Sequence, residues 1–392
     1  MEQTALMPDT APAPAPRKGS ELAEFTVNTG DLLRELSGLQ RVVARKSTAP
    51  ILANVHIQAA SGALFLTASD TTLSLRSTCP AKVRKEGRLT LPAHKLHNYV
   101  RLLEDGDISM RLMDNNWVQI KNGRSHTRMT GLPPENFPSL PLFPAASAIK
   151  LDANAMRTLI AQTLFAVCVE ESRYVFNGAL LKVTPEGTAL VATDGHRLAY
   201  AELAKAQTIA ETRILIPKRA LTELSSLLSA SSAESIQFAQ DDSTLYFGIG
   251  SRLLTSQKIA GMFPNYEAVL PQPLPHKAVV SRQELLFALQ RVAQFSDERS
   301  NCVRIRLSSN EFKLASSSAE TGEAEDILPT TFAGEPKAIS FNSQYLLDFL
   351  KAVDCENVRL EFKDGESAGE FKPEESADKS YSYRYVVMPL RT

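Results

Sequence analysis

Three stretches of the chain repeat one pattern, and this repetition constrains the fold more than any other feature. In each stretch a short apolar strand leads to a residue that can cap a helix, and an amphipathic helix follows. The strands begin at Phe25, Ile149 and Ala278, and the expected caps are Asp31, Asp152 or Asn154, and Ser281. These strands start roughly 125 residues apart, which indicates three copies of one domain.

Each copy contains the same pattern twice. A second apolar strand, at 89–92, 214–217 and 338–341, again precedes a helix with one apolar stripe. Because such a stripe must be buried against another element, we expect the six helices to pack on sheets. The predicted fold class is therefore α+β, with three pseudo-repeated domains that each consist of a doubled strand–helix–strands unit.

Proline-rich segments separate these repeats. Residues 11–16 alternate alanine and proline. This alternation buries little surface, and its prolines prevent a helix. We therefore expect 1–24 to be a disordered Pro/Ala-rich tail. Prolines also gather at 133–144 and 271–275, as is typical of linkers between domains. The expected domains are 25–146, 147–275 and 276–392.

Composition excludes several classes of protein. The chain has 392 residues, too many for one core, and its 43% hydrophobic and 22% charged residues are ordinary for a soluble protein. It has no apolar run near the roughly 18 residues of a membrane helix, and no signal-peptide core. The four cysteines form no CxxC pair. We expect buried free thiols in a reducing cytoplasm, and no membrane partner.

No set of residues indicates catalysis or a cofactor. Asp194 and His196 lie too close in sequence to orient one another as in a catalytic triad, and the chain has no GxSxG elbow. His94 and His97 could share a helix face, but no third ligand accompanies them, so we expect surface histidines and no metal. Glycine-rich nucleotide-binding motifs are absent from the sequence. The chain is predicted not to be an enzyme.

Two segments predict exposed apolar groups beside arginine. The string 192–200, ATDGHRLAY, places Asp194-Gly195 between two apolar runs, which indicates a turn at a sheet rim. We expect Thr193, His196 and Arg197 to face solvent there. The C-terminal YVVMPLRT contains a short strand that Pro389 ends, which leaves apolar residues at an exposed terminus. FPNYEAVLP, at 263–271, is a third segment of this kind, and together they would suit a groove for a short peptide.

These same strings carry a family resemblance. ATDGHRLA, FPNYEAVLP and YVVMPLR, in this order and spacing, resemble the bacterial DNA polymerase III β subunit, the β sliding clamp. The resemblance runs from about Phe25 to Arg391. It implies a head-to-tail homodimer that closes a ring, encircles duplex DNA and tethers the replicative polymerase as a processivity factor. The helices would line the ring and face the DNA.

The resemblance also implies site residues. For the peptide groove between the second and third domains it implies Arg173, Phe176, Thr193, Gly195, His196, Arg197, Leu198, Pro264, Val269, Asn342, Tyr345, Val386, Met388, Pro389, Leu390 and Arg391. For DNA it implies Arg45, Lys46, Lys95, Tyr174, Lys218 and Arg219. The net charge of −1 means that any DNA contact must come from a local arrangement of basic residues, and the predicted helices are mildly basic.

The implied partners are duplex DNA, a second copy of the chain, the catalytic subunit of the replicative polymerase and a clamp-loading ATPase. Other polymerases and repair proteins with short clamp-binding motifs would use the same groove, in the cytoplasm at the nucleoid. Two alternatives remain from the sequence: a diverged clamp-fold scaffold that binds peptides but does not load on DNA, and, more distantly, a hydrolase using Asp194 and His196.

Overall fold

The computed structural model describes residues 22–43, 49–204, 211–270, 273–332, 334–374 and 380–391, with the backbone alone at 171–173. The chain divides into two compact units. Unit 1 consists of Met1–Asn154 and Arg219–Lys258, and unit 2 of Ala155–Lys218 and Ile259–Thr392. No helix in the described part is long and apolar enough to cross a membrane.

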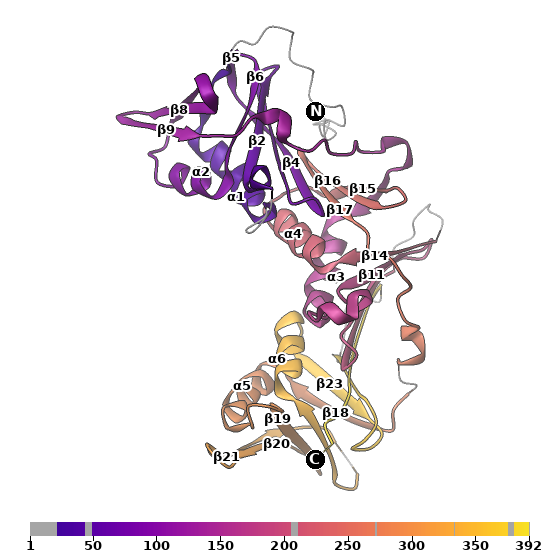
Figure 1. The fold of residues 1–392 in the computed structure, drawn as a ribbon. Coiled ribbons are helices and arrows are strands. Elements are labelled where there is room, and N and C mark those ends of the chain that lie inside the picture. The colour runs from indigo at the N-terminus through magenta and orange to yellow at the C-terminus, as the bar shows by residue number, and fades with distance from the viewer. Residues whose placement is uncertain are drawn as a thin grey trace, which may run out of the picture. The chain divides into compact units, whose positions relative to one another are not determined.

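Unit 1 contains two antiparallel sheets (Figure 1). The five-stranded sheet has the order β5 (Lys82–Lys85), β1 (Glu24–Asn28), β7 (Asp107–Leu112), β8 (Trp117–Asn122), β9 (Ser125–Thr130). The eight-stranded sheet has the order β10 (Ile149–Asp152), β15 (Ser235–Gln240), β16 (Thr244–Ile249), β17 (Arg252–Gln257), β4 (Leu73–Pro80), β3 (Ala63–Ser69), β2 (Asn54–Ala60), β6 (Gly87–Pro92).

Unit 2 repeats this arrangement. Its eight-stranded sheet has the order β18 (His276–Ser281), β23 (Asn357–Phe362), β24 (Gly369–Pro373), β25 (Tyr381–Val387), β13 (Arg197–Leu203), β12 (Thr188–Thr193), β11 (Gly178–Val183), β14 (Thr212–Pro217). The four-stranded sheet has the order β21 (Gly322–Pro329), β20 (Glu311–Ser318), β19 (Cys302–Ser308), β22 (Lys337–Asn342).

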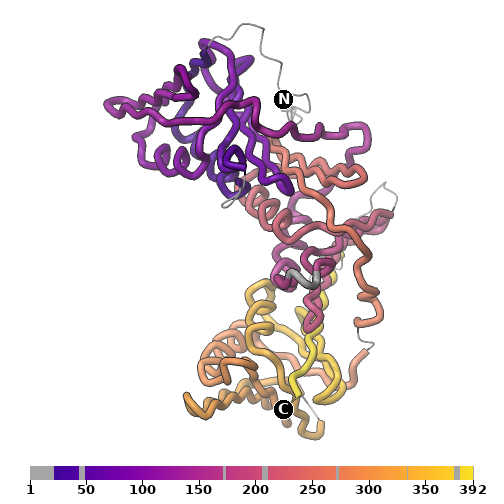
Figure 2. Tube along the Cα trace, viewed as in Figure 1, coloured from indigo at the N-terminus to yellow at the C-terminus, as the bar shows by residue number. Residues whose placement is uncertain are grey.

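Each eight-stranded sheet joins strands from two consecutive repeats. In unit 1 the joining pair is β4 with β17, and in unit 2 it is β13 with β25, so residues 175 to 190 positions apart lie side by side (Figure 2). The two pairs have matching registers: Ser74 lies opposite Thr255, and Leu198 lies opposite Val386.

The described residues form six α-helices, as the repeat predicts. They are α1 (Thr29–Val42), α2 (Ala93–Val100), α3 (Ala153–Thr163), α4 (Lys218–Ser229), α5 (Arg282–Val292) and α6 (Ser343–Ala352). In unit 1, α1 packs against α2, β3 and β4, and buries Leu32, Leu36 and Leu39 completely. In unit 2, α5 packs against α6 (Figure 1). The apolar stripe read from the sequence is therefore the buried face of each of these helices.

The helix caps match the prediction in one case and not in another. Ser281 accepts a hydrogen bond from the Glu284 backbone N–H at 3.4 Å, as expected for an N-cap. The expected cap Asp31 is wrong. Asn28 caps α1, and its Oδ1 accepts from the N–H groups of Gly30 at 2.9 Å and Asp31 at 3.3 Å. Asp31 lies within the first turn, where its charge favours the helix N-terminus.

The four cysteines are free thiols, as predicted. Cys79 and Cys168 are buried, whereas Cys302 and Cys355 are only partly buried. Burial raises the pKa of Cys79 to about 12, and it also raises the pKa of Cys302 and of Cys355. Because the thiolate is the reactive form, these three thiols are poor nucleophiles at neutral pH.

The expected tail ends earlier than the sequence suggested. Residues 1–21 lie outside the described part of the chain, but Ala23 and Glu24 belong to the fold. Ala23 is fully buried, and its carbonyl oxygen accepts a hydrogen bond from the Leu112 N–H at 2.8 Å. Glu24 begins β1 and pairs with Arg84.

Truncation at two positions tests this boundary. A chain that starts at Leu22 should keep the melting temperature of the full chain. A chain that starts at Phe25 should lose about 1–3 kcal/mol of unfolding free energy, because the Leu112 N–H loses its acceptor. Scanning calorimetry of both chains measures the difference, and equal melting temperatures would show that Ala23 and Glu24 do not support β1.

Candidate peptide-binding surface

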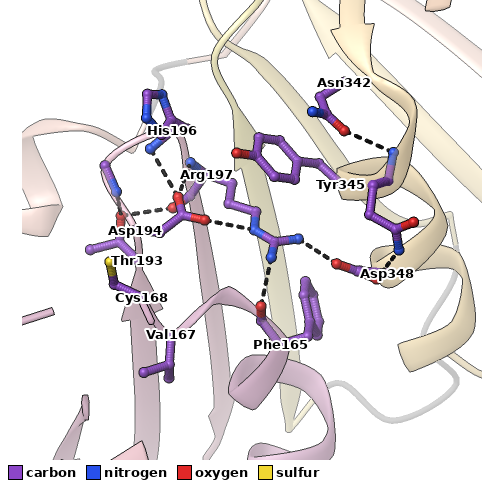
Figure 3. Close-up of polar contacts among 12 residues, drawn as sticks. Phe165, Val167, Cys168, Thr193, Asp194, His196, Arg197, Asn342, Tyr345 and Asp348 are labelled. Atoms are coloured by element: carbon purple, nitrogen blue, oxygen red, sulfur yellow. Dashed lines mark hydrogen bonds and ion pairs between the residues drawn. The ribbon is translucent and has the colours of Figure 1, made fainter. Parts of the chain in front are cut away.

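A tight turn between β12 and β13 organises this part of unit 2. Gly195 has a φ of +90°, which side chains other than glycine rarely adopt. Thr193 Oγ1 donates to the Arg197 carbonyl at 2.7 Å and accepts from the Gly195 N–H at 3.1 Å. Asp194 Oδ1 accepts from the N–H groups of His196 at 2.9 Å and Arg197 at 3.0 Å (Figure 3). The turn predicted from Asp194-Gly195 is confirmed.

Arg197 is held at the centre of a polar network. Its Nε donates to Asp194 Oδ2 at 3.0 Å and its Nη1 to Asp348 Oδ2 at 2.7 Å. Its Nη2 donates to the Phe165 carbonyl at 2.7 Å (Figure 3). The guanidinium also lies 4.3 Å from the centre of the Tyr345 ring, within range of a cation–π contact. Arg197 thus joins β13 to α6 and to the segment that follows α3.

The prediction that Thr193 and Arg197 face solvent is therefore wrong. Thr193 is buried, and the Arg197 side chain is only 10% exposed. Burial by itself lowers the pKa of Arg197, but Tyr385 and the carboxylates of Asp348 and Asp194 outweigh it and raise the pKa above its ordinary value. The arginine stays charged because two carboxylates compensate for its desolvation. Arg197 therefore has an internal, structural position.

An apolar cluster lies beside the turn. Its buried members are Leu180, Val191, Leu198, Tyr266 and Val386, and its partly buried members are Tyr200, Phe263, Leu270 and Ala368. The rings of Tyr200 and Tyr266 stack with centroids 5.9 Å apart. Tyr200 and Tyr266 lie within the strings 192–200 and 263–271, but they were not among the site residues that the resemblance implied.

The C-terminal segment reaches this cluster by pairing with the turn. The strand β25 ends at Val387, which confirms that the sheet ends before Pro389. Beyond it, the Met388 N–H donates to the His196 carbonyl at 2.9 Å, and the Leu390 N–H donates to the Ser340 carbonyl at 2.8 Å. Met388 and Val269 are nearly half exposed. Apolar side chains from three segments therefore meet here, as the sequence predicts.

The other predicted groove residues differ in their surroundings. Asn342 caps α6, where it accepts from the Gln344 N–H at 2.9 Å and donates to the Ser300 carbonyl at 3.3 Å. Pro264 and Arg391 are exposed, and Phe176 is partly buried. The side chain of Arg173 lies outside the described part of the chain. For all these residues, contact with a peptide remains a prediction.

The predicted DNA-contacting residues fall into three groups. Lys95 and Tyr174 are exposed. Lys218 donates to the Val167 carbonyl at 3.0 Å, and burial, followed by the Arg197 charge, lowers its pKa. Arg219 pairs with Asp70 and donates to the Val42 carbonyl at 3.1 Å. Arg45 and Lys46 lie outside the described residues. Lys218 and Arg219 thus already have internal partners, which sequence reasoning did not foresee.

The histidine pair on α2 is not a surface pair. His97 is buried, and its Nε2 lies 3.3 Å from Ser37 Oγ and 3.2 Å from Gln40 Nε2. His94 Nδ1 lies 3.3 Å from Gln40 Oε1. The expectation of two surface histidines is wrong for His97, because α2 packs against α1. Within the described ranges, no group of three His, Cys, Asp or Glu residues could hold a metal ion.

Comparison with known proteins places the chain in a family. The DNA polymerase III beta subunit N-terminal domain matches residues 23–141, the central domain matches 150–265, and the C-terminal domain matches 267–391. The chain belongs to the DNA polymerase III beta subunit family. The family resemblance predicted from three short strings is thereby confirmed.

Relatives match nearly from end to end. The Beta sliding clamp of Escherichia coli K12 is 32% identical over 371 residues, which cover 94% of this chain and all of that protein. That of Synechococcus elongatus is 33% identical over 370 residues and covers 92% of this chain and 97% of its own length. The crystal structure of a sliding clamp from Pseudomonas aeruginosa bound to griselimycin has a TM-score of 0.87 at 30% identity and covers 95% of this chain and 100% of its own.

Replacing Arg197 tests its structural role. Arg197→Ala should lower the free energy of unfolding by about 3–5 kcal/mol, because Asp194 and Asp348 would lose the cation that compensates their charges. Arg391→Ala, at an exposed terminal position, is the matched control and should change little. Urea denaturation followed by circular dichroism measures both. An Arg197→Ala midpoint equal to that of the wild type would show that this arginine only lines a surface.

Proposed function

We propose that this protein is a DNA sliding clamp: a homodimeric ring that encircles duplex DNA and tethers the replicative polymerase through the surface around Leu198 and Met388. The proposal rests on the arrangement of the four sheets. Two are complete eight-stranded sheets, and the other two contain the strands of the two halves of such a sheet. Membership of the beta subunit family supports it. This function requires no catalysis. The protein would act in the cytoplasm at the nucleoid.

The strand order indicates how a ring would close. The strands β1-β7-β8-β9 correspond in order to β10-β15-β16-β17, and β22-β19-β20-β21 correspond to β6-β2-β3-β4. In the complete sheets, the strands equivalent to β9 and β21 pair with each other. Among the described residues, β9 and β21 are the last strands of their sheets. Pairing of β9 with β21 of a second copy would build a third eight-stranded sheet, and doing so twice gives a closed head-to-tail dimer.

Register and charge support this pairing. If β9 and β21 follow the registers of β17 with β4 and of β25 with β13, Glu323 lies opposite Arg128 of the second copy, and Glu325 lies opposite His126. All four side chains are exposed in the single chain. Arg128 and Glu323 carry opposite charges, and such a facing pair in an antiparallel ladder contributes roughly 0.2–1 kcal/mol.

The DNA-facing role rests on charge and on the family. Sliding requires attraction to phosphates without readout of bases, since a base-specific contact would stop the ring at one sequence. Basic helix residues on a chain with a net charge of −1 suit such a weak, local attraction. We propose Lys95 and Tyr174, which are exposed, and Arg45 and Lys46 as contacts. A clamp-loading ATPase would open the ring, and other polymerases and repair proteins would share the peptide-binding surface.

Retention on circular DNA tests the proposal. Protein loaded by its clamp-loading ATPase on nicked circular DNA should elute with the DNA in gel filtration and be lost once the DNA is linearised. Retention on both forms would indicate ordinary DNA binding, which would contradict a sliding ring. Loss from both would favour a clamp-fold scaffold that does not load on DNA.

A charge reversal tests the proposed dimer contact. Arg128→Glu and Glu323→Arg should each raise the dimer dissociation constant roughly tenfold or more, because the unfavourable pair occurs at both interfaces of a ring. The double variant should regain most of the affinity. Sedimentation equilibrium measures it, and Arg111→Glu, at an exposed position on the inner strand β7, is the control. A double variant no better than either single variant would contradict the register.

Deletion of Met388–Thr392 tests the peptide-binding surface. Peptides derived from the polymerase should no longer bind, because Met388 and Leu390 supply apolar contacts that adapt to different partners. The fold of unit 2 should persist, since only two of the backbone hydrogen bonds described above are lost, at about 2 kcal/mol. His196→Ala should weaken binding less, because its imidazole lies on an exposed turn. Calorimetry gives the affinities, and wild-type affinity of the deletion would show that the site lies elsewhere.

A further inference from the structure

A pocket of about 370 Å³ lies in unit 1 against the eight-stranded sheet. It is bounded by the segment Pro134–Phe143 and by side chains of β2, β3, β4, β6 and β17. Its volume is within the usual range of pockets for small ligands or for a few peptide side chains. Nothing in the activity described above uses it.

This pocket occupies the same place in its sheet as the apolar cluster does in unit 2. In unit 1, paired residues form the row His56, Thr67, Arg76, Leu253 across four strands. In unit 2, the corresponding row is Leu180, Val191, Tyr200, Arg384. A Phe-Pro pair from the following linker lies beside each row: Phe137-Pro138 lines the pocket, and Phe263 packs on the cluster. The two sites are therefore pseudo-equivalent by register.

The chemistry of the two rows is different. Apolar Leu180 and Val191 are matched in the pocket by His56 and Thr67, and Tyr200 is matched by Arg76. Arg76 is partly buried, and its Nη2 donates to the Leu140 carbonyl at 2.8 Å. Arg88 lies exposed at the same pocket. Within the described part of the chain, neither arginine forms an ion pair. Among the described residues that line the pocket, Glu135 is the one carboxylate, so the charged groups of the pocket sum to a positive charge.

Apolar walls accompany these cations. Phe65, Phe137 and Leu142 line the pocket, and the ring of His56 packs on Phe137 with centroids 5.3 Å apart. Burial, followed by the Arg88 charge, lowers the pKa of His56 to about 4, so the imidazole is neutral near pH 7. A ligand that matches the pocket therefore combines a negative charge with an apolar body.

We propose that this pocket is a second peptide-binding site, which takes a segment with an acidic side chain next to an aromatic or aliphatic one. The acidic group meets Arg76 and Arg88, and the apolar side chain lies on Phe65 and Phe137. The choice of a peptide rests on the proposed function of the pseudo-equivalent surface in unit 2. The two sites differ in selectivity, because the unit 1 row has Arg76 at the position where the unit 2 row has Tyr200.

A pair of matched peptides tests the proposal. A fluorescein-labelled capped pentapeptide, Gly-Phe-Glu-Leu-Gly, should bind saturably to the full-length protein in an anisotropy titration. Its twin with Gln in place of Glu should bind at least fivefold more weakly. Arg88→Gln and Arg76→Gln should weaken the Glu peptide at least fivefold and leave the Gln peptide unchanged. Arg111→Gln, outside the pocket, should change neither.

Three further measurements distinguish failure of this pocket from failure of the unit 2 surface and from misfolding. The chain without Met388–Thr392 should still bind the Glu peptide, so failure of the unit 2 surface and failure of this pocket are separable. Arg88→Gln serves if Arg76→Gln does not fold, because within the described residues Arg76 and not Arg88 donates a hydrogen bond to the segment Pro134–Phe143. The ring signals of His56 in NMR spectra should shift on binding. Any of four results would overturn the proposal: no saturable binding, equal binding of the Glu and Gln peptides, binding of free phenylacetate but not of the peptides, or binding that neither arginine change affects.

Discussion

Backbone pairing between consecutive repeats is the interaction on which this structure depends. The pairs β4 with β17 and β13 with β25 each convert two four-stranded halves into one continuous sheet. A strand edge with unpaired N–H and C=O groups can pair with another strand. The five-stranded and four-stranded sheets end at such edges, at β9 and β21, among the described residues. In the proposed ring, the same pairing would be repeated between two copies, with no new type of contact required.

Side chains at each joining pair determine what its surface can bind. In unit 2 the Arg197 network fixes the turn and α6, so apolar residues can be presented beside it in one arrangement. In unit 1 the equivalent turn carries Asp70, which pairs with Arg219, and the adjacent row is polar. A shared backbone thus supports two surfaces of different chemistry, and the difference comes from a few positions that point out of the sheet.

Local patterns predicted the elements, but long-range contacts decided the site. The six helices follow from their apolar stripes, and the turn at Asp194-Gly195 follows from glycine's tolerance of positive φ. The exposure of Arg197 could not be predicted, because its partner Asp348 lies 151 residues further along the chain. The internal partners of Lys218 and Arg219 could not be predicted for the same reason, since the Val167 carbonyl and Asp70 are distant from them in sequence. The burial of Tyr266 could not be predicted, because no periodicity in the string FPNYEAVLP marks one of its residues as buried.

In the proposed ring, β9 and β21 complete a third sheet between two copies. Hydrogen exchange of their backbone amides, measured by mass spectrometry over a range of protein concentrations, tests it most directly. The account predicts slow exchange in both strands at high concentration and faster exchange in both when dilution separates the copies, with β4 and β17 unchanged. Exchange in β9 and β21 that does not depend on concentration, while the protein goes from dimer to monomer, would contradict it.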